Sequence, residues 1–579
     1  MLRAGESLLE LHPQCATKLL KECVCAAPSY IAQVCHPDLT KKSLSLFDDR
    51  IWQLWLKLLG GVDQPELACC PAVLSKARNR AFLPSRFEGV GIRSWSLASN
   101  FAWFSSVASC IALDDRDFNY ARVLLGKKAE DAYEMVMDAI GGPSYLSECK
   151  FEIIPACEPD VLANSTFYYD LFRDLEFVKL QHEFMELACA RAHRNFVKTP
   201  AHPNDVSERI VLESMKFEKK SLLPRLFTAS LLQRDARLTK AEFIIVARQF
   251  VNLPQLNNMQ GKIQTLPCGC QEQLCANPSC LKKTGPAPVL DTAGNHARIC
   301  HPGIKAVKAT TLERALEEQF RHAGGVPIRQ PSTYALLGSV FYKPDLAKLF
   351  PANLTKEQAA ERTKMAMEYL DYLRLPRGHI RTAKIGVWRD ELPPAPSAQD
   401  HVNENTDHGV IRFDLRLTSA VPIGRPEELV IDHAIVHETS PTHAPAVVKY
   451  LESKRENQPG ESPAFIKTRQ QKSRHYACLV PVLERLSDDR KLGSKPTVLY
   501  PVISSLGYMN EDMNRVMKFI LDRFKQNLHG QPPRLDGLAP KFLRGRFKAV
   551  LKNSVCFALV KGNALAMSNQ GQWGVVRPV

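Results

Sequence analysis

The chain has 579 residues, of which 45% are hydrophobic and 24% are charged, and it carries a net charge of +15 at pH 7. Its length exceeds the size of one compact core, so we expect about three or four domains, and its ordinary hydrophobic content excludes wholesale disorder. No run of about 18 apolar residues occurs, which excludes a membrane-spanning helix, whereas the excess of Lys and Arg favours a polyanionic partner such as nucleic acid.

The first 255 residues are predicted to be helical. Apolar residues recur at helical spacing from Leu8 to Val24 and from Ile51 to Leu59, and prolines separate such segments. We divide this stretch into a helical domain at residues 1–150 and a second one at residues 151–255. The sequence FDDR at 47–50 shares letters with a polymerase metal motif, but strand-like sequence flanks it on neither side, so we do not interpret it as a metal site.

Residues 256–325 differ because seven Cys and His residues fall within 34 positions. Zn²⁺ takes four thiolate or imidazole ligands in a tetrahedron, usually as two close pairs on short turns. Cys268 and Cys270 supply one pair, and His296 and Cys300 supply the other. The 17 Cys form an odd number and no secretory signal is visible, which favours reduced thiols in an intracellular protein. We therefore predict a structural zinc knuckle, followed by a helix.

Two further thiols leave the ligand set of this knuckle open. Cys275 and Cys280 lie between the two pairs, and with Cys268 and Cys270 they could form an all-thiolate site. A third interpretation is a group of ordinary cysteines without metal, because the Cys-x-Cys spacing is tighter than the common Cys-x-x-Cys.

Residues 326–400 are predicted to be a helical connection that ends in a linker. Thr310 with Glu313 forms a capping box that is expected to begin the helix after the knuckle, and Thr355 with Gln358 forms one that is expected to begin a helix in this connection. Residues 387–408 are rich in Pro and polar side chains, which is typical of a linker. Beyond residue 400 the pattern changes to short strand-like segments, and we predict an α/β domain with a mixed sheet at residues 401–530.

Two acids lie inside strand-like apolar runs of this domain. Asp414 in IRFDLRLTSA and Asp432 in ELVIDHAIVH are 18 positions apart, which fits two strands joined by a hairpin loop. An acid in such a run is costly unless it has a task. Phosphodiester hydrolysis needs a divalent metal, and Mg²⁺ takes one or two carboxylates from a protein. We predict that both acids hold catalytic Mg²⁺ or Mn²⁺; the alternative is two edge-strand acids that face solvent.

The same chemistry needs a Lys that stabilises developing charge near the attacking water. Many such nucleases carry this Lys two positions after the second acid, where this chain has Ala434. The Lys must then come from the following helices, which offer Lys449, Lys454, Lys467 and Lys472, and we favour Lys472 because it lies one helical turn from Tyr476. The predicted nucleic-acid contacts are Arg412, Lys454, Lys467, Arg474 and Tyr476.

The last predicted elements are a strand, a helix and a tail. PTVLYPVISSLG at 496–507 is strand-like, and Asn510 is predicted to cap the next helix. One face of that helix is predicted to be apolar. Its six residues are Met513, Val516, Met517, Ile520, Leu521 and Phe524. We interpret residues 531–579 as a basic C-terminal tail.

Taken in order, these motifs resemble the C-terminal portion of non-LTR (LINE-like) retrotransposon polyproteins of the class that carries a restriction-like endonuclease. HPQCATKLLKECVCAAPSYIAQVC with FDDRI is similar to the thumb that follows a reverse transcriptase palm, and SRFEGVGIRSWSLASNFAWFSS is similar to a stretch further on. CGC with DTAGNHARIC resembles the family's zinc knuckle. RFDLRL, VIDHAIVHETS, KSRHY and YPVISSLG resemble its two acid-bearing strands, its Lys–Tyr helix and its next strand.

The resemblance implies a thumb-like helical region, a zinc knuckle and a restriction-endonuclease-like domain, in a nuclear protein that binds DNA and RNA and nicks DNA. It also implies that the polymerase palm is absent, so that the chain is not a competent reverse transcriptase alone. Two departures from the family pattern are an insertion at about 271–290 and the His433-Ala434 pair after the second acid. The alternative function is therefore a catalytically inactive, zinc-containing nucleic-acid-binding fragment, and a third is a helical interaction protein whose charge is incidental.

Overall fold

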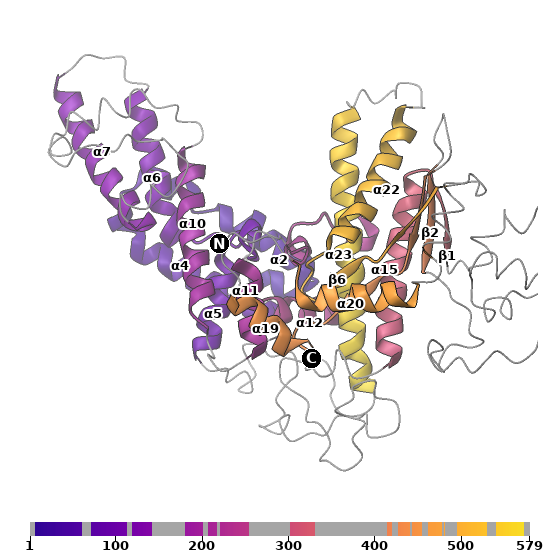
Figure 1. Ribbon diagram of the computed structural model, residues 1–579. Coiled ribbons are helices and arrows are strands. Elements are labelled where there is room, and N and C mark those ends of the chain that lie inside the picture. The colour runs from indigo at the N-terminus through magenta and orange to yellow at the C-terminus, as the bar shows by residue number, and fades with distance from the viewer. Residues whose placement is uncertain are drawn as a thin grey trace, which may run out of the picture. The chain divides into compact units, whose positions relative to one another are not determined.

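The computed structural model describes fourteen parts of the chain, which are residues 6–60, 71–112, 119–141, 180–200, 206–216, 221–253, 302–329, 414–419, 427–440, 443–453, 461–476, 480, 495–529 and 540–572. The chain divides into two compact units. Unit 1 comprises residues 1–301 with 563–579, and unit 2 comprises residues 302–562. The protein is mostly helical with a small mixed sheet, which confirms that part of the predicted fold class (Figure 1). None of the described helices is long and apolar enough to cross a membrane.

Unit 1 is helical, as predicted. Its longer helices are α2 (Pro13–Glu22), α4 (Pro37–Leu58), α5 (Pro71–Phe82), α6 (Trp95–Ala112), α7 (Asn119–Ile140), α10 (Leu180–Lys198), α11 (Val206–Lys216) and α12 (Lys240–Phe250). Its short elements are η1 (Ser7–Glu10), η2 (Val24–Ala26), α3 (Ser29–Val34), η4 (Ser85–Phe87), η6 (Leu223–Phe227) and η7 (Arg234–Ala236). Buried aromatic residues from α6 and α10, among them Phe101, Phe104 and Phe184, pack with Val136 of α7. The two helical domains predicted at 1–150 and 151–255 thus share one unit.

Helix starts in unit 1 follow local sequence rules. His12 and His36 each precede a proline at the first helical position, where the missing N–H costs nothing, and each ring accepts a hydrogen bond from the next turn. Thr239 and Glu242 form a complete capping box at the start of α12. The FDDR sequence lies within the helix α4, which confirms that it is not a strand-borne metal motif.

Unit 2 contains the sheet. Its strands are β1 (Val326–Arg329), β2 (Leu415–Ser419), β3 (Glu427–Ile431) and β5 (Lys495–Leu499), in the order β1-β2-β3-β5. The first two pairings are antiparallel and the last is parallel. A second parallel pair joins β4 (Ala434–Val436) to β6 (Val502–Ser504). The predicted strands are confirmed, but the second and third are each interrupted, at residues 432–433 and 500–501.

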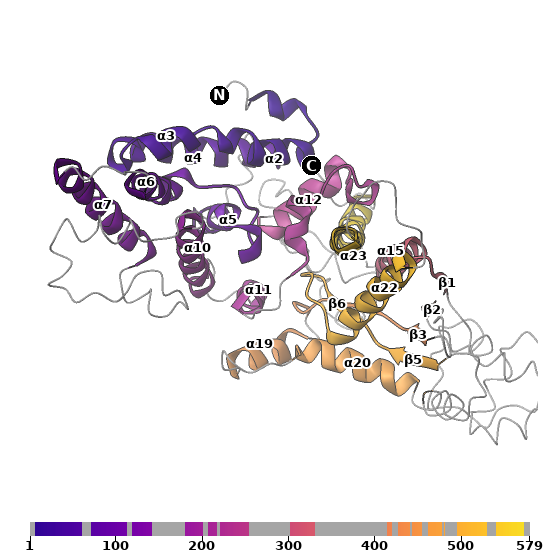
Figure 2. The same cartoon turned by 90° about the horizontal axis from the view of Figure 1, so that it is seen from above.

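The helices of unit 2 are α15 (Pro302–His322), α19 (Ala444–Ser453), α20 (Pro463–His475), α22 (Glu511–His529) and α23 (Pro540–Gln572), of which α23 belongs to this unit as far as Gly562. Three of them, α15, α20 and α22, contact the strands. Figure 2 shows α15 and α22 on one side of the strands and α20 on the other. The predicted cap of α22 is confirmed, since Asn510 Oδ1 accepts from the main-chain N–H of Met513 at 2.9 Å. Of the predicted apolar face, five side chains are buried and Phe524 is half-buried.

Three expectations for this region were wrong. The helix α15 begins at Pro302, so the Thr310–Glu313 pair lies inside it, and Glu313 instead accepts from Arg329 Nε at 2.9 Å. Residues 326–329, placed in a helical connection, form the strand β1 because they pair with β2. Much of the supposed basic tail is the helix α23, whose middle is buried, and Phe547 of α23 stacks on Phe524 of α22 with ring centroids 4.0 Å apart.

Candidate functional site

The sheet register brings the two predicted acids together. Asp414 immediately precedes β2, and Asp432 immediately follows β3. Because these strands are antiparallel and Leu415 pairs with Ile431, the position before one is opposite the position after the other. The main-chain N–H of Asp414 donates to Ile431 O at 2.9 Å, which holds the start of β2 against the end of β3. The start of β2 and the end of β3 therefore form one edge with two carboxylates.

The electrostatics of the two acids differ although they are neighbours. Burial raises the pKa of Asp432 to about 6, and the nearby Asp414 carboxylate adds to the rise, while Lys472 opposes it. Burial also acts to raise the pKa of Asp414, but His433 and Lys472 outweigh it and hold the pKa of that carboxyl well below its usual range. Two acids that share a site and titrate apart in this way are typical of functional pairs.

Lys472 is the lysine that reaches this edge. It lies on α20, and its Nζ is 2.5 Å from Asp432 Oδ1. Its side chain is 25% exposed, so it is open to a ligand from outside. Among the other candidates, Lys449 and Lys467 are exposed on their helices, and Lys454 lies outside the described residues. The structure thus brings Asp414, Asp432 and Lys472 together from three separate elements.

His433 is a site residue that the sequence analysis did not select. Its Nδ1 and its main-chain N–H both donate to Asp414 Oδ2, each at 2.7 Å, and its Nε2 donates to Ala309 O of α15 at 2.9 Å. Both ring nitrogens therefore face acceptors, which fits the doubly protonated form. Burial acts to lower the pKa of His433, but the charge and hydrogen bond of Asp414 outweigh it and the pKa is raised. The signal in the sequence was a lone His directly after a strand acid, which does not distinguish a site from a core.

Tyr476 lies behind the acids. It is only 2% exposed and donates a hydrogen bond to Asp432. Burial, with the charges of both carboxylates, raises its pKa above the usual range. Its ring stacks on that of Tyr500 at 6.0 Å between centroids, and burial raises the pKa of Tyr500 to about 12. The expectation that Tyr476 contacts nucleic acid directly is wrong, because its side chain is buried against Asp432.

The remaining predicted residues divide into two groups. Lys467 and Arg474 are exposed on α20, the helix that carries Lys472, so both are accessible to a phosphate backbone. The other predicted positions lie outside the described residues, which are Arg412, Lys454, Cys268, Cys270, Cys275, Cys280, His296 and Cys300.

The residues at this sheet edge fit a divalent cation that takes only one or two ligands from the protein. Within the described parts of the chain, no group of three or more His, Cys, Asp or Glu side chains is arranged to hold a metal. Mg²⁺ typically takes one or two protein carboxylates and keeps its remaining positions for water and phosphate. Asp414 and Asp432 would supply these two, since each has a carboxylate at the same sheet edge.

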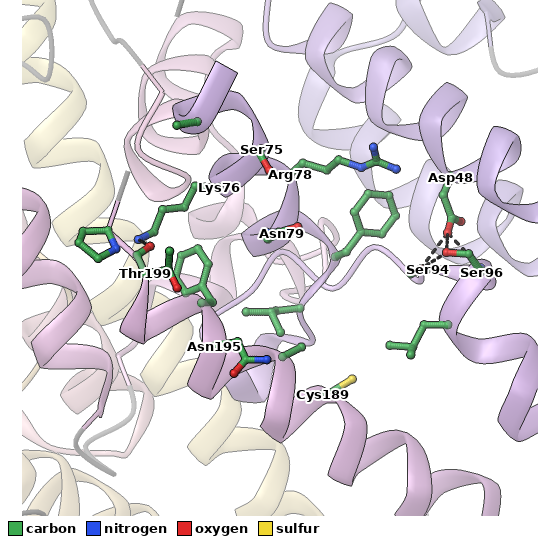
Figure 3. Close-up of a pocket in the computed structure, with 17 residues that line it drawn as sticks. Asp48, Ser75, Lys76, Arg78, Asn79, Ser94, Ser96, Cys189, Asn195 and Thr199 are labelled. Atoms are coloured by element: carbon green, nitrogen blue, oxygen red, sulfur yellow. Dashed lines mark hydrogen bonds between the residues drawn. The ribbon is translucent and has the colours of Figure 1, made fainter. Parts of the chain in front are cut away.

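Unit 1 contains a cavity of about 680 Å³ between α5, α10 and the start of α6. Figure 3 shows Asp48 at one end, linked to Ser94 and Ser96, and Lys76 with Thr199 at the other. The Asp48 carboxylate also accepts from the main-chain N–H groups of Trp95 and Ser96, so it caps α6. Lys76 is paired with Glu208 at 3.1 Å, and Arg78 is paired with Asp49. Lys76 and Arg78 are therefore paired with acids and the Asp48 carboxylate is hydrogen-bonded, and we assign no ligand to this cavity.

Comparison with known proteins gives this chain no family. No protein-family model matches it, and no curated protein is significantly similar to it.

Proposed function

We propose that the protein is a retroelement-derived, nucleic-acid-binding protein whose unit 2 is a divalent-metal-dependent DNA endonuclease that nicks duplex DNA. The single observation that carries the proposal is the meeting of Asp414, Asp432 and Lys472 at one sheet edge. The order of motifs along the sequence and the net charge of +15 support a nucleic-acid substrate. The zinc knuckle of Cys268, Cys270, His296 and Cys300 remains part of this proposal as a structural module.

Each residue at the edge has a task in this proposal. Asp414 and Asp432 would hold Mg²⁺ or Mn²⁺, which when bound would polarise the scissile phosphate and activate water. Lys472 places a cation beside Asp432, where it stabilises negative charge that develops on the phosphate. His433 fixes the orientation of Asp414, and Tyr476 fixes that of Asp432 from the buried side.

The test is a nicking assay on supercoiled plasmid with Mg²⁺ or Mn²⁺. We expect Asp432→Asn, Asp414→Asn and Lys472→Ala to lower the nicking rate by at least about a hundredfold, since each removes a metal ligand or the charge-stabilising cation. Two matched controls should nick like the parent: Glu427→Gln, at the exposed opposite end of β3, and Lys449→Ala, an exposed lysine of α19. Nicking by Asp432→Asn at the parental rate would refute the mechanism.

The second candidate function is a nucleic-acid-binding protein without catalysis. The observation in its favour is that both carboxylates already have cationic partners, Asp414 in His433 and Asp432 in Lys472. Such an edge is neutralised without a metal, as in a nuclease that has lost its activity. DNA binding that persists in EDTA, with no nicking under Mg²⁺ or Mn²⁺, would select this function over the first.

A further inference from the structure

The first three turns of α23 carry positive charge and no acid. Along its whole length, from Pro540 to Gln572, the helix contains six basic residues and neither Asp nor Glu. Arg544, Arg546 and Lys548 are exposed, and Phe542 is 57% exposed beside them. Asp522 of α22 lies 3.6 Å from Arg544, and both groups of that pair remain more than 40% exposed. The cations are thus presented to solvent.

The exposed side chains form one face because of the helical period. At about 100° per residue, Lys548 and Arg546 lie on the two flanks of the solvent face, with Gly545 and Ala549 between them. A side-chain carbon added at Gly545 would meet no atom within 4 Å. Phe542 lies along the same ridge, one turn before Arg546. This face, which we call the strip, has Arg546 and Lys548 on its two sides, Gly545 between them and Phe542 at one end.

This face is firmly anchored. Residues Leu551 and Val555 to Val560 are buried, so the next turns of the helix are packed inside the protein. Phe547 points away from the strip and stacks on Phe524 of α22, with the two rings only 6° from parallel. Figure 1 shows α23 beside α22 and α15, the helices that cover the sheet. A ligand bound to the strip would therefore be held at a fixed position relative to unit 2.

We infer that the solvent face of α23 around Arg546 and Lys548 is a binding surface for the sugar-phosphate backbone of nucleic acid. Phosphate neutralisation by Arg and Lys supplies sequence-independent affinity for this backbone. The open floor at Gly545 lets a backbone approach the helix between the two cations. The inference rests on the nucleic-acid part of the proposed function and adds a second contact away from Asp414 and Asp432.

The test measures binding of the full chain to a 30-base-pair DNA duplex in EDTA, so that cleavage plays no part. The variant Arg546→Glu/Lys548→Glu should lower the affinity by at least about tenfold and reduce the slope of log K against log salt by about 2. Gly545→Glu should also lower the affinity without loss of folding, because the added Cβ meets no atom within 4 Å and Glu is a better helix former than Gly. The matched control is Lys41→Glu/Lys42→Glu, which makes the same change of charge at two exposed positions of α4.

The outcomes separate the inference from its rivals. Parental affinity and salt slope in Arg546→Glu/Lys548→Glu would overturn it, and so would an equal loss in the α4 control, which would show an effect of net charge alone. Loss of binding to phosphatidylserine vesicles, with duplex binding retained, would assign the strip to a lipid surface instead and also overturn it. If the parent nicks plasmid but the α23 variants bind the duplex like the parent, the proposed function is supported and this inference is overturned. A parent that does not bind the duplex at all would refute both.

Discussion

The main-chain N–H and the imidazole Nδ1 of His433 converge on a single oxygen of Asp414, each at 2.7 Å. The far nitrogen of the same ring reaches Ala309 O on α15, so one side chain ties the sheet edge to the covering helix. In metal-free protein the Asp414 carboxylate thus already has a fixed orientation and a cationic partner.

Replacing His433 should destabilise the protein, and the loss should be smaller if the new side chain can still donate a hydrogen bond to Asp414. His433→Ala removes a hydrogen bond to a charged group and the imidazolium, and we expect a loss of about 2 kcal/mol in the free energy of unfolding. His433→Asn should lose less, because its side-chain amide can donate to Asp414 from nearly the same place as Nδ1. Urea unfolding in EDTA measures both, and equal losses for the two variants would contradict the assigned role.

The raised pKa of Asp432 gives the metal-free protein a pH-dependent stability. Because the pKa of Asp432 is about 6 in the folded protein, above its ordinary value, the folded state binds the proton more tightly than the unfolded state does. The stability that this proton contributes is complete below about pH 4 and is lost as the pH rises through 6. The lowered pKa of Asp414 affects stability only at pH values below its ordinary pKa, and the raised pKa of His433 only at values above its ordinary pKa. Between pH 4 and 6 the pH dependence of stability at this edge therefore comes mainly from Asp432. Asp432→Asn should therefore gain stability relative to the parent as the pH is raised from 4 to 7.

That comparison is made by urea unfolding in EDTA at several pH values. Glu427→Gln, at the exposed end of the same strand, provides the control and should follow the parent at each pH. A constant difference between Asp432→Asn and the parent across this range would be incompatible with a raised pKa of Asp432.

Asn510 should be among the more sensitive single positions in unit 2. It is fully buried; its Oδ1 accepts from Val502 N and Met513 N, and its Nδ2 donates to Tyr500 O. Asn510→Ala leaves these buried groups without their partner and should cost about 2–4 kcal/mol of unfolding free energy. Asn514→Ala, at an exposed position of α22, should change it by less than about 0.5 kcal/mol. Similar losses for both variants would mean that the cap is not what stabilises the β6–α22 junction.

The zinc prediction is tested by metal content. We expect the purified chain to contain about one Zn²⁺ per molecule, and the Cys268→Ala/Cys270→Ala variant to lose it. Cys275→Ala/Cys280→Ala is the discriminating variant: it keeps the metal if His296 and Cys300 complete the site, and loses it if the site is all-thiolate. Metal-free parental protein prepared without chelator would refute the knuckle.

Much of the candidate site could be predicted from the sequence because its two acids are close together along the chain. The two acids lie in period-2 apolar runs, and their spacing of 18 fits one hairpin, so their proximity follows from antiparallel register. Lys472 was favoured through its spacing to Tyr476, although Tyr476 itself proved to be buried against Asp432. A helical period places two residues on one face, but it does not tell which of them faces the protein.

What could not be predicted depends on contacts between distant segments. The role of His433 depends on Ala309, 124 positions away, and the four-residue strand β1 exists through its pairing with β2. Residues 531–579 were interpreted as a basic tail, whereas much of this segment is the helix α23, whose middle is buried and whose Phe547 stacks on Phe524 of α22. Such tertiary contacts decide whether a helix is stable more than local sequence preference does.

The parallel pairing of β3 with β5 has a consequence for how the site assembles during folding. Parallel neighbours need a long crossover, and here the crossover contains α20 and therefore Lys472. The acids meet through a short hairpin, a fast and local event, whereas the lysine arrives only when the chain has closed a far larger loop. Lys472 precedes β5 in the chain, but its helix α20 contacts β6, which follows β5, so the lysine is held beside the acids only after the last strands have joined unit 2.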